Sequence, residues 1–243
     1  MILQSQSKFM KLLAASLDGG KRSWIPFMNR NLKNILSRSH IKVVIIAAVL
    51  GSLGAFIYRT SVFRPAKNFH EVDPGKFYRS AQLAKDEFDE IVKRYGIRTV
   101  INLRGSQPGE WWFDDEKTEL ERLNVRMLNL GFSTEQLQTK EDWQQYIEVL
   151  KTAERPILVH CRSGADRTGE ATAVYSIDYM GASRQQALEH VSVKYLHVTL
   201  FHPAKRLFVE NYEGADWLRE KFDPCEPKFR PYARIESRCP PIR

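Results

Sequence analysis

The stretch HCRSGADRTG, residues 160–169, is the part of this 243-residue sequence from which the fold and the chemistry can be worked out. It follows PILVHC (156–161), a short apolar run that is typical of a buried strand, and it runs into TGEATAVYSIDYM (168–180), which is typical of a helix. A loop between a buried strand and a helix lies at the carboxyl end of a sheet strand, where ligands usually bind in α/β proteins. We therefore expect the functional site at this loop.

Cys161 and Arg167 stand at the two ends of the loop, with five residues between them that include Gly164. Such a loop can curl until successive backbone N–H groups point at one centre, and with the N-terminus of the following helix they form a cradle for an anion. The planar guanidinium of Arg167 can hold two phosphate oxygens at once, which a lysine cannot do. The same amides favour the thiolate form of Cys161, which is the nucleophile.

These residues resemble the phosphate-binding loop H-C-x5-R-[ST]-G of cysteine-dependent phosphatases, in their dual-specificity-like branch. The segments FYRSAQ (77–82) and GIRTVINLR (96–104) also resemble bacterial members of that branch, among them membrane-anchored or periplasmic tyrosine phosphatases. The resemblance covers about residues 70–210. The loop is its specific part, because residue types, spacing and the strand–helix context agree there.

The resemblance implies a role for each residue of the loop. Cys161 would attack phosphorus, Arg167 would bind the phosphoryl group, and the hydroxyl of Thr168 would help the sulfur leave when water hydrolyses the cysteinyl-phosphate. His160 would brace the loop. The other positions of the phosphate-binding loop are Arg162, Ser163, Gly164, Ala165 and Gly169. Arg167 and the backbone amides would carry the charge stabilisation, so we expect neither a metal nor another cofactor.

The general acid is not evident from the sequence. The family usually supplies an aspartate from a separate loop, and the corresponding stretch LNLGFSTEQ (128–136) contains none. Asp166, inside the phosphate-binding loop, is the other candidate, because some lipid-directed relatives carry a loop aspartate that is thought to protonate the leaving oxygen. A structural role for Asp166 is about equally consistent with the pattern. The further residues of this region are Asn129, Ser133, Glu135 and Asp142.

Several residues outside the loop are open to more than one interpretation. Trp111 and Trp112 begin a predicted helix, and we favour core packing over a place at the pocket rim. Arg104 ends a predicted strand near the expected site and is a candidate for substrate binding. His197 and His202 do not have a simple metal-binding spacing, and we interpret both as structural.

Strand and helix patterns alternate along the sequence from about residue 75. The patterns predict strands over 76–81, 98–104, 125–130 and 156–161, and helices over 85–95, 111–124, 140–153, 168–180, 183–193 and 203–221. Strands separated by helices indicate an α/β fold with a central mixed or parallel sheet flanked by helices, as in dual-specificity phosphatases. One N-terminal transmembrane helix would precede this domain.

The composition is that of an ordinary globular protein, with 43% hydrophobic and 27% charged residues. The net charge of +8 is concentrated in residues 1–42, which hold eight Lys or Arg and one acid, so the remainder is nearly neutral. A nearly neutral domain does not favour nucleic acid as a partner.

Residues 43–58, VVIIAAVLGSLGAFIY, form an uncharged apolar run near the lower length limit for a membrane-spanning helix. We favour an uncleaved signal anchor over a cleaved signal peptide, a mitochondrial transit peptide or a buried core helix. Basic residues dominate the flank before the run, so the N-terminus is expected inside and the rest outside, which gives a single-pass protein of the inner membrane with a periplasmic catalytic domain. Met28 is an alternative start.

The sequence thus divides into a basic cytoplasmic segment (1–42), the anchor (43–58), the catalytic domain (59–221) and an irregular tail rich in proline and arginine (222–243). Cys225 and Cys239 lie fourteen residues apart in the tail, and in an oxidising compartment they could form a disulfide.

We expect a phosphomonoesterase, and we favour a protein tyrosine or dual-specificity phosphatase. The alternative substrate is a phosphorylated envelope lipid or sugar, such as lipid A or a phospholipid head group. A catalytically weak module that only binds phosphorylated groups is the second alternative, although Cys161, Arg167 and Thr168 are all present.

Overall fold

The computed structural model describes residues 38–63, 67–237 and 239–240. The chain divides into two compact units, Met1–Ser61 and Val62–Arg243. Most of the expected basic segment, Met28 included, lies outside the described residues.

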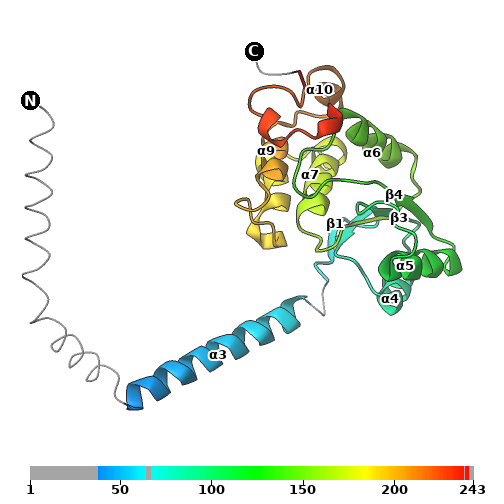
Figure 1. Cartoon of the computed structure of the whole chain (residues 1–243). Helices are drawn as coiled ribbons and strands as arrows, with labels where there is room; N and C mark the ends of the chain where they lie inside the picture. The colour runs from blue at the N-terminus through cyan, green and yellow to red at the C-terminus, as the bar shows by residue number, and fades with distance from the viewer. Residues whose placement is uncertain (1–37, 64–66, 238, 241–243) are drawn as a thin grey trace, which may run out of the picture. The chain divides into compact units, whose positions relative to one another are not determined.

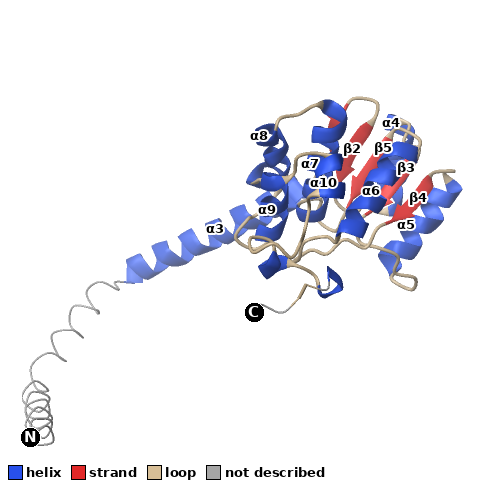
Figure 2. Ribbon diagram, turned by 90° about the horizontal axis from the view of Figure 1, so that it is seen from above, coloured by secondary structure: helices blue, strands red, loops and turns tan. Residues whose placement is uncertain are grey.

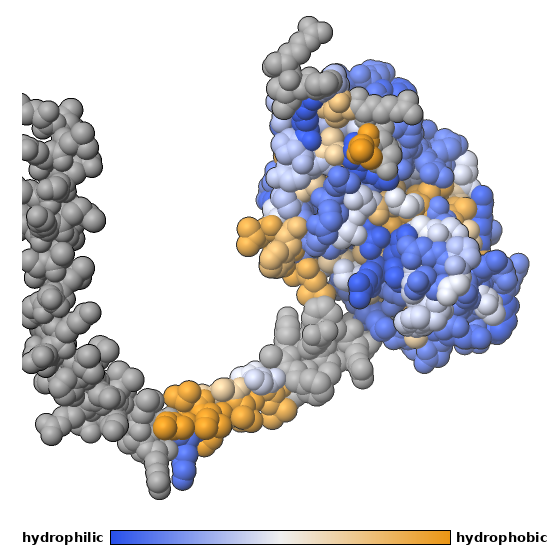
Figure 3. All heavy atoms as spheres, in the orientation of Figure 1, coloured by the Kyte–Doolittle hydropathy of each residue, from blue (hydrophilic) through white to orange (hydrophobic). Residues whose placement is uncertain are grey.

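Helix α3 (Arg38–Phe63) contains the apolar run 43–58. Eight of its large apolar side chains between Ile41 and Leu53 are exposed, and Figure 3 shows an apolar surface over that stretch. In the part of the chain that the structure describes, no helix has both the length and the apolar character needed to cross a membrane. The anchor expected at 43–58 stays a prediction.

A five-stranded sheet with the order β1-β2-β5-β3-β4 forms the centre of the second unit (Figures 1 and 2). The strands are β1 (His70–Asp73), β2 (Phe77–Ser80), β3 (Thr99–Asn102), β4 (Arg126–Asn129) and β5 (Ile157–His160). All neighbours pair in parallel except β1, which pairs antiparallel with β2. The predicted mixed α/β sheet and its four predicted strands are confirmed, whereas β1 was not predicted.

Helices pack on both faces of this sheet. They are α4 (Lys85–Tyr95), α5 (Trp111–Arg122), α6 (Lys140–Thr152), α7 (Asp166–Met180), α8 (Arg184–Ala187), α9 (Pro203–Asn211) and α10 (Ala215–Glu220). Successive strand residues point to opposite faces, so Tyr78 joins the core under α4 and α5, while Phe77 joins the core under α6, α7 and α9. The register places the carboxyl ends of β2, β5 and β3 level, at Ser80, His160 and Asn102.

Helices α5 and α6 end one or two residues before their predicted ends, and three other predicted helices also differ from the observed ones. Helix α7 begins at Asp166, two residues before the predicted start, so the polar residues at the end of the loop form its first turn. The helix expected over 183–193 becomes α8 followed by two 3-10 turns, η1 (Leu188–Val191) and η2 (Val193–Tyr195). The helix expected over 203–221 is interrupted at Gly214, whose φ of 107° does not fit a helix, and it forms α9 and α10.

The described part of the C-terminal tail lacks long elements, as predicted, but it is part of the folded unit. It contains the 3-10 turns η3 (Arg230–Tyr232) and η4 (Ile235–Ser237), and the side chains of Phe222 and Phe229 are buried in the core. A disulfide joins Cys225 to Cys239. The pairing that the sequence suggested is therefore present.

Candidate active site

The phosphate-binding loop connects the end of β5 to the start of α7, at the carboxyl edge of the sheet. Its first residue, Cys161, is 1% exposed. Burial raises the pKa of the Cys161 thiol, but the charge of Arg167, the hydroxyl and amide of Thr168 and the amide of Gly164 lower it, and the net pKa lies below the ordinary value. The residues expected to form an anion cradle therefore surround a sulfur that is poised to ionise.

We expect the thiolate of Cys161 to titrate below the usual cysteine value of about 8.5. Because the other two cysteines form the disulfide, the ultraviolet absorbance of the thiolate in the native chain reports Cys161 alone. The thiolate is present at pH values above this lowered pKa and is lost as the pH falls through it. The value of kcat/KM should therefore fall at acid pH with the same midpoint. Thr168→Val removes the hydroxyl and should raise the midpoint; an unchanged midpoint would contradict this role.

Arg167 lies beside Cys161 with hydrogen-bonding capacity to spare. Its Nη1 donates to the carbonyl of Leu103 (3.2 Å), which fixes the guanidinium against the end of β3. Its Nε is buried and has no hydrogen-bond partner among the described residues. A buried donor without a partner is costly, and an oxyanion at the sulfur would supply the acceptor.

Arg79, which the sequence analysis missed, braces the loop from β2. The side chain is fully buried, its Nη2 donates to the carbonyl of Gly164 (2.6 Å), and its guanidinium lies 4.1 Å from the ring centroid of Tyr195. Burial lowers the pKa of Arg79 to about 10. Burial and the charge of Arg79 lower the pKa of His190 to about 3, so this imidazole is neutral and its Nδ1 can accept from Arg79 Nη1 (3.3 Å).

Two glycines let the loop fit against its surroundings. Gly164 has a φ of 69°, and a Cβ there would lie 2.7 Å from backbone atoms of Ser80 and Ala81. A Cβ on Gly169, in α7, would lie 2.4 Å from the carbonyl oxygen of His190. Both glycines are therefore required by close backbone contacts, the first also by its conformation.

Gly164→Ala is expected to lower the free energy of unfolding by about 1–3 kcal/mol, through strain at the positive φ and the clash with β2. The distorted loop should also lose much of its phosphatase activity. Gly181→Ala is a matched control, because Gly181 has a similar φ of 67° but open space at its Cβ and caps α7 away from the loop. Urea unfolding and phosphate release measure the two effects, and equal activity losses in both variants would contradict the argument.

A hydrogen-bonded chain of side chains lies behind His160. Its Nε2 donates to the buried carboxylate of Glu116 (2.8 Å), Gln82 Nε2 donates to the same carboxylate (2.7 Å), and Gln82 Oε1 accepts from Arg104 Nη1 (2.8 Å). The guanidinium of Arg104 stacks on Trp112, 3.2 Å from the ring centroid. These contacts hold His160 in a position from which it can brace the loop. The series of hydrogen bonds extends from His160 to Arg104, which follows β3.

Asp166 lies between two histidines that we had interpreted as structural. His197 Nδ1 is 2.8 Å from Asp166 Oδ1, and His202 Nε2 is 3.7 Å from Asp166 Oδ2. The second ring nitrogen of His202 is 3.4 Å from Glu135, whose side chain is otherwise exposed. The structure therefore groups Asp166 with two imidazoles at the start of α7, which sequence spacing could not indicate.

The other candidates for the general acid hold the backbone. Asn129 accepts from Asn102 Nδ2 (2.9 Å), and the amide of Ser133 donates to Gln138 (2.7 Å). Asp142 accepts from the amide of Thr139 and from Arg234, at 2.9 and 3.0 Å, and caps α6. In the described part of the chain, no hydrogen bond or ion pair joins these three side chains to the loop, whereas Asp166 is a carboxylate within the loop itself.

The remaining loop positions contribute mainly through the backbone. Arg162 and Ser163 are exposed, whereas Ala165 is buried. The carbonyl of Arg162 accepts from the amide of Gln82 (3.3 Å), and that of Ser163 accepts from Asn68 Nδ2 (3.2 Å). These contacts hold the loop against the segment around β2.

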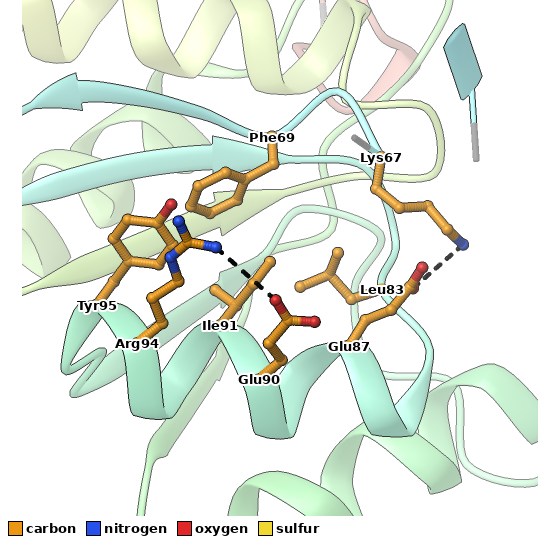
Figure 4. Close-up of a pocket in the computed structure, with 8 residues that line it drawn as sticks. All are labelled: Lys67, Phe69, Leu83, Glu87, Glu90, Ile91, Arg94 and Tyr95. Atoms are coloured by element: carbon orange, nitrogen blue, oxygen red, sulfur yellow. Dashed lines mark ion pairs between the residues drawn. The ribbon is translucent and has the colours of Figure 1, made fainter. Parts of the chain in front are cut away.

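Two further features lie outside this site. Among the described residues, no group of three or more His, Cys, Asp or Glu is arranged to hold a metal ion. The pocket drawn in Figure 4 lies against α4 and is lined by Lys67, Phe69, Leu83, Glu87, Glu90, Ile91, Arg94 and Tyr95. Its charged groups pair with each other, Lys67 with Glu87 and Arg94 with Glu90, and none of the lining residues belongs to the loop.

A family model and curated relatives that match this chain both describe phosphatases. Residues 62–202 match a family model described as DSP-PTPase phosphatase fused to NAD+ kinase. The dual specificity protein phosphatase TpbA of Pseudomonas aeruginosa is 30% identical over 129 residues, which are 52% of this chain and 54% of TpbA. The chain therefore spans about half the length of the curated relatives it matches.

Solved structures agree with this result. A crystal structure of TpbA aligns with a TM-score of 0.52 and 25% identity, covering 64% of this chain and 90% of that one. A TpbA structure in complex with pTyr gives 0.50 and 25%, with coverages of 64% and 96%. The catalytic core of the PP-IP phosphatase SIW14 from S. cerevisiae shares the fold, with a TM-score of 0.52 and 20% identity over 69% of this chain and 96% of that core.

Proposed function

Because the chain belongs to the DSP-PTPase phosphatase family, we propose that it hydrolyses phosphate monoesters through a cysteinyl-phosphate on Cys161, with phosphotyrosine in a protein as the substrate. The observation that carries this proposal is the convergence on one sulfur of Arg167, the Thr168 hydroxyl and two backbone amides, which together lower the pKa of the thiol. Phosphotyrosine is supported by TpbA, which has been solved with pTyr.

In the first step the thiolate of Cys161 attacks phosphorus. The S–P bond forms while the P–O bond to the leaving group breaks, and its electron pair goes to the leaving oxygen. Arg167 and the loop amides stabilise the charge on the other three oxygens. A phenolate leaves readily, whereas an alkoxide needs a proton, and Asp166 is the group proposed to donate it.

In the second step water attacks phosphorus, the P–S bond breaks and inorganic phosphate leaves. The sulfur departs as a thiolate, which the Thr168 hydroxyl and the Arg167 charge stabilise as they do in the free enzyme. The proton that water loses goes to the Asp166 carboxylate, which is thereby ready for the next cycle. His197 and His202 hold that carboxylate in place.

A phosphorylated lipid is the second candidate substrate, and one observation favours it. The turn between His197 and His202 exposes Leu200 by 83% and Phe201 by 68%, and both histidines contact Asp166. Two large apolar side chains thus lie on a turn that is fixed to the active site. Such side chains suit the acyl part of an amphiphile.

The test is phosphate release by the full chain from a phosphotyrosine peptide, an aryl phosphate and a dispersed lipid phosphate. Turnover of the peptide and the aryl phosphate that tolerates Asp166→Asn supports the tyrosine substrate. Turnover of the lipid phosphate that is lost in Asp166→Asn supports the second candidate. The absence of turnover on all three substrates would overturn both and favour a module that only binds phosphorylated groups.

We also propose that the catalytic unit works outside the cytoplasm, held by the apolar run 43–58. Support comes from the eight basic residues before that run and from the Cys225–Cys239 disulfide, since disulfides persist in oxidising compartments. Alkaline phosphatase fused after residue 243 should be active, and a β-galactosidase fusion at the same position should not. The reverse result would overturn this placement.

A further inference from the structure

Besides Arg79, which braces the loop, three arginines lie near Cys161, and the proposed reaction uses one of them. Arg167 binds the phosphoryl group, while Arg104 and Arg162 have no assigned part. The charges of Arg167 and Arg162 both lower the pKa of Arg104, so the three guanidinium groups are close enough to repel one another. Among the described residues, none of the three forms an ion pair with a carboxylate.

Arg104 is held in one orientation. Its guanidinium stacks on Trp112, and its Nη1 donates to Gln82 Oε1 (2.8 Å). The side-chain amide of Gln82 is neutral, so this contact orients the guanidinium of Arg104 without cancelling its charge. Stacking and one hydrogen bond leave the other donors of the planar fork available, and a fixed fork loses little freedom when it binds an anion.

Backbone contacts place Arg104 beside the cradle. The carbonyl of the preceding residue, Leu103, accepts from Arg167 Nη1 (3.2 Å). Gln82 links Arg104 to Arg162. Its backbone N–H donates to the carbonyl of Arg162 (3.3 Å), and its side chain accepts from Arg104. Arg104 is thus connected to both ends of the phosphate-binding loop.

The charge of Arg104 is costly where it lies. Burial, with smaller contributions from the charges of Arg167 and Arg162, lowers its pKa to about 10, against opposing contributions from Glu116 and Cys161. It therefore remains cationic at neutral pH without a direct counter-ion. Arg167 and the loop amides already bind the phosphate of a monoester. The charge of Arg104 therefore remains without an anionic partner when one phosphate is bound.

We propose that Arg104, assisted by Arg162, binds a second phosphate of the substrate, adjacent to the one attacked by Cys161. This inference rests on the proposed cysteinyl-phosphate chemistry at Cys161, and in place of phosphotyrosine it favours substrates with two neighbouring phosphates, either a diphosphate or two phosphates on adjacent carbons. A guanidinium binds a phosphate with two parallel hydrogen bonds, which is the contact that the exposed part of the Arg104 fork can make.

Binding in the Cys161→Ser full chain tests the proposal without turnover. Inorganic phosphate and inorganic pyrophosphate are titrated calorimetrically, as ligands with one and two phosphates. We expect pyrophosphate to bind about tenfold more tightly or better, the scale of one added charge-assisted contact. Adding Arg104→Gln should remove most of this preference, and adding Arg104→Lys should keep part of it. Arg184→Gln, which removes a half-exposed arginine paired with Glu213, controls for net charge.

Each outcome decides the question. Equal weakening of both ligands by Arg104→Gln would mean that Arg104 only supports Gln82 and the loop, and would overturn the proposal. The same pyrophosphate loss in Arg184→Gln would overturn it in favour of general electrostatics. An Arg104 effect confined to a phosphotyrosine peptide with a neighbouring glutamate, compared with a glutamine peptide, would overturn it in favour of a peptide carboxylate. If the wild-type chain turned over no substrate, the proposed function would fail while this binding result would still stand.

Discussion

Replacing Cys161 by serine is expected to lower phosphate release by at least about 10⁴-fold, the scale on which losing a nucleophile affects an enzyme. The environment that favours the thiolate consists of Arg167, Thr168 and Gly164, and its stabilisation is enough to lower the pKa of a thiol. It is far too small to ionise a serine hydroxyl. The loss should appear in kcat, while phosphotyrosine still binds, because the serine leaves the anion-binding groups in place.

The measurement is steady-state phosphate release together with equilibrium binding of a phosphotyrosine peptide. The double variant Cys225→Ser/Cys239→Ser is a matched control, because it removes the other two sulfur atoms and leaves the catalytic thiol. It should keep wild-type activity under conditions where the fold is retained. Turnover by Cys161→Ser within tenfold of the wild type would show that Cys161 is not the nucleophile.

The parts of the fold that follow from local sequence patterns could be predicted. The strands at 99–102 and 157–160 are rich in β-branched residues, the strand at 77–80 begins with two aromatic residues, and each was found within the predicted range. The loop could be located because its residue types, spacing and context are all contained in ten consecutive residues. Strand β1 escaped prediction because HEVD is too polar to stand out.

The groups around the loop could not be predicted, because they meet only in the folded chain. Arg79 and Gly164 are 85 residues apart, and His160 and Glu116 are 44 apart, yet each pair is joined by a buried hydrogen bond. A charged residue in a strand pattern normally indicates a solvent-facing position, whereas Arg79 is fully buried. The 3-10 turns after α8 have the same origin, since the carbonyl of His190 must approach Gly169 within α7.

Glu170, in α7, and Lys205, in α9, form a buried ion pair that no sequence pattern indicated. Neither side chain is exposed, and Lys205 Nζ lies 3.2 Å from Glu170 Oε2. Lys205 also donates to the carbonyl of Gln136 (2.6 Å), and Gln138 donates to the same carboxylate (3.2 Å). The pair therefore ties α7 and α9 to the segment that precedes α6.

Burial dominates the titration of both partners. It raises the pKa of Glu170 to about 7 despite the nearby ammonium group, and it lowers the pKa of Lys205. The folded state thus binds more protons than the unfolded chain between about pH 4.5 and 7, because the pKa of Glu170 rises on folding. Stability from this group is then highest at low pH and decreases as the pH rises through that window. The attraction between the partners offsets the cost of burying them rather than exceeding it.

Lys205→Met is accordingly expected to lower the free energy of unfolding by about 3–5 kcal/mol at pH 8, where Glu170 is mostly ionised in the wild type, because it leaves a buried carboxylate without its partner. The destabilisation should shrink as the pH falls and Glu170 takes up a proton. The double variant Glu170→Gln/Lys205→Met retains the shapes of the two side chains and the contact with Gln138, and it has no buried charge at either position. It should therefore recover most of the lost stability. Urea unfolding of the wild type, Glu170→Gln, Lys205→Met and the double variant at pH 5 and pH 8 completes the cycle. If the double variant were as unstable as Lys205→Met, the loss would come from the packing and the Gln136 contact of the lysine, and the unpaired charge would not be its cause.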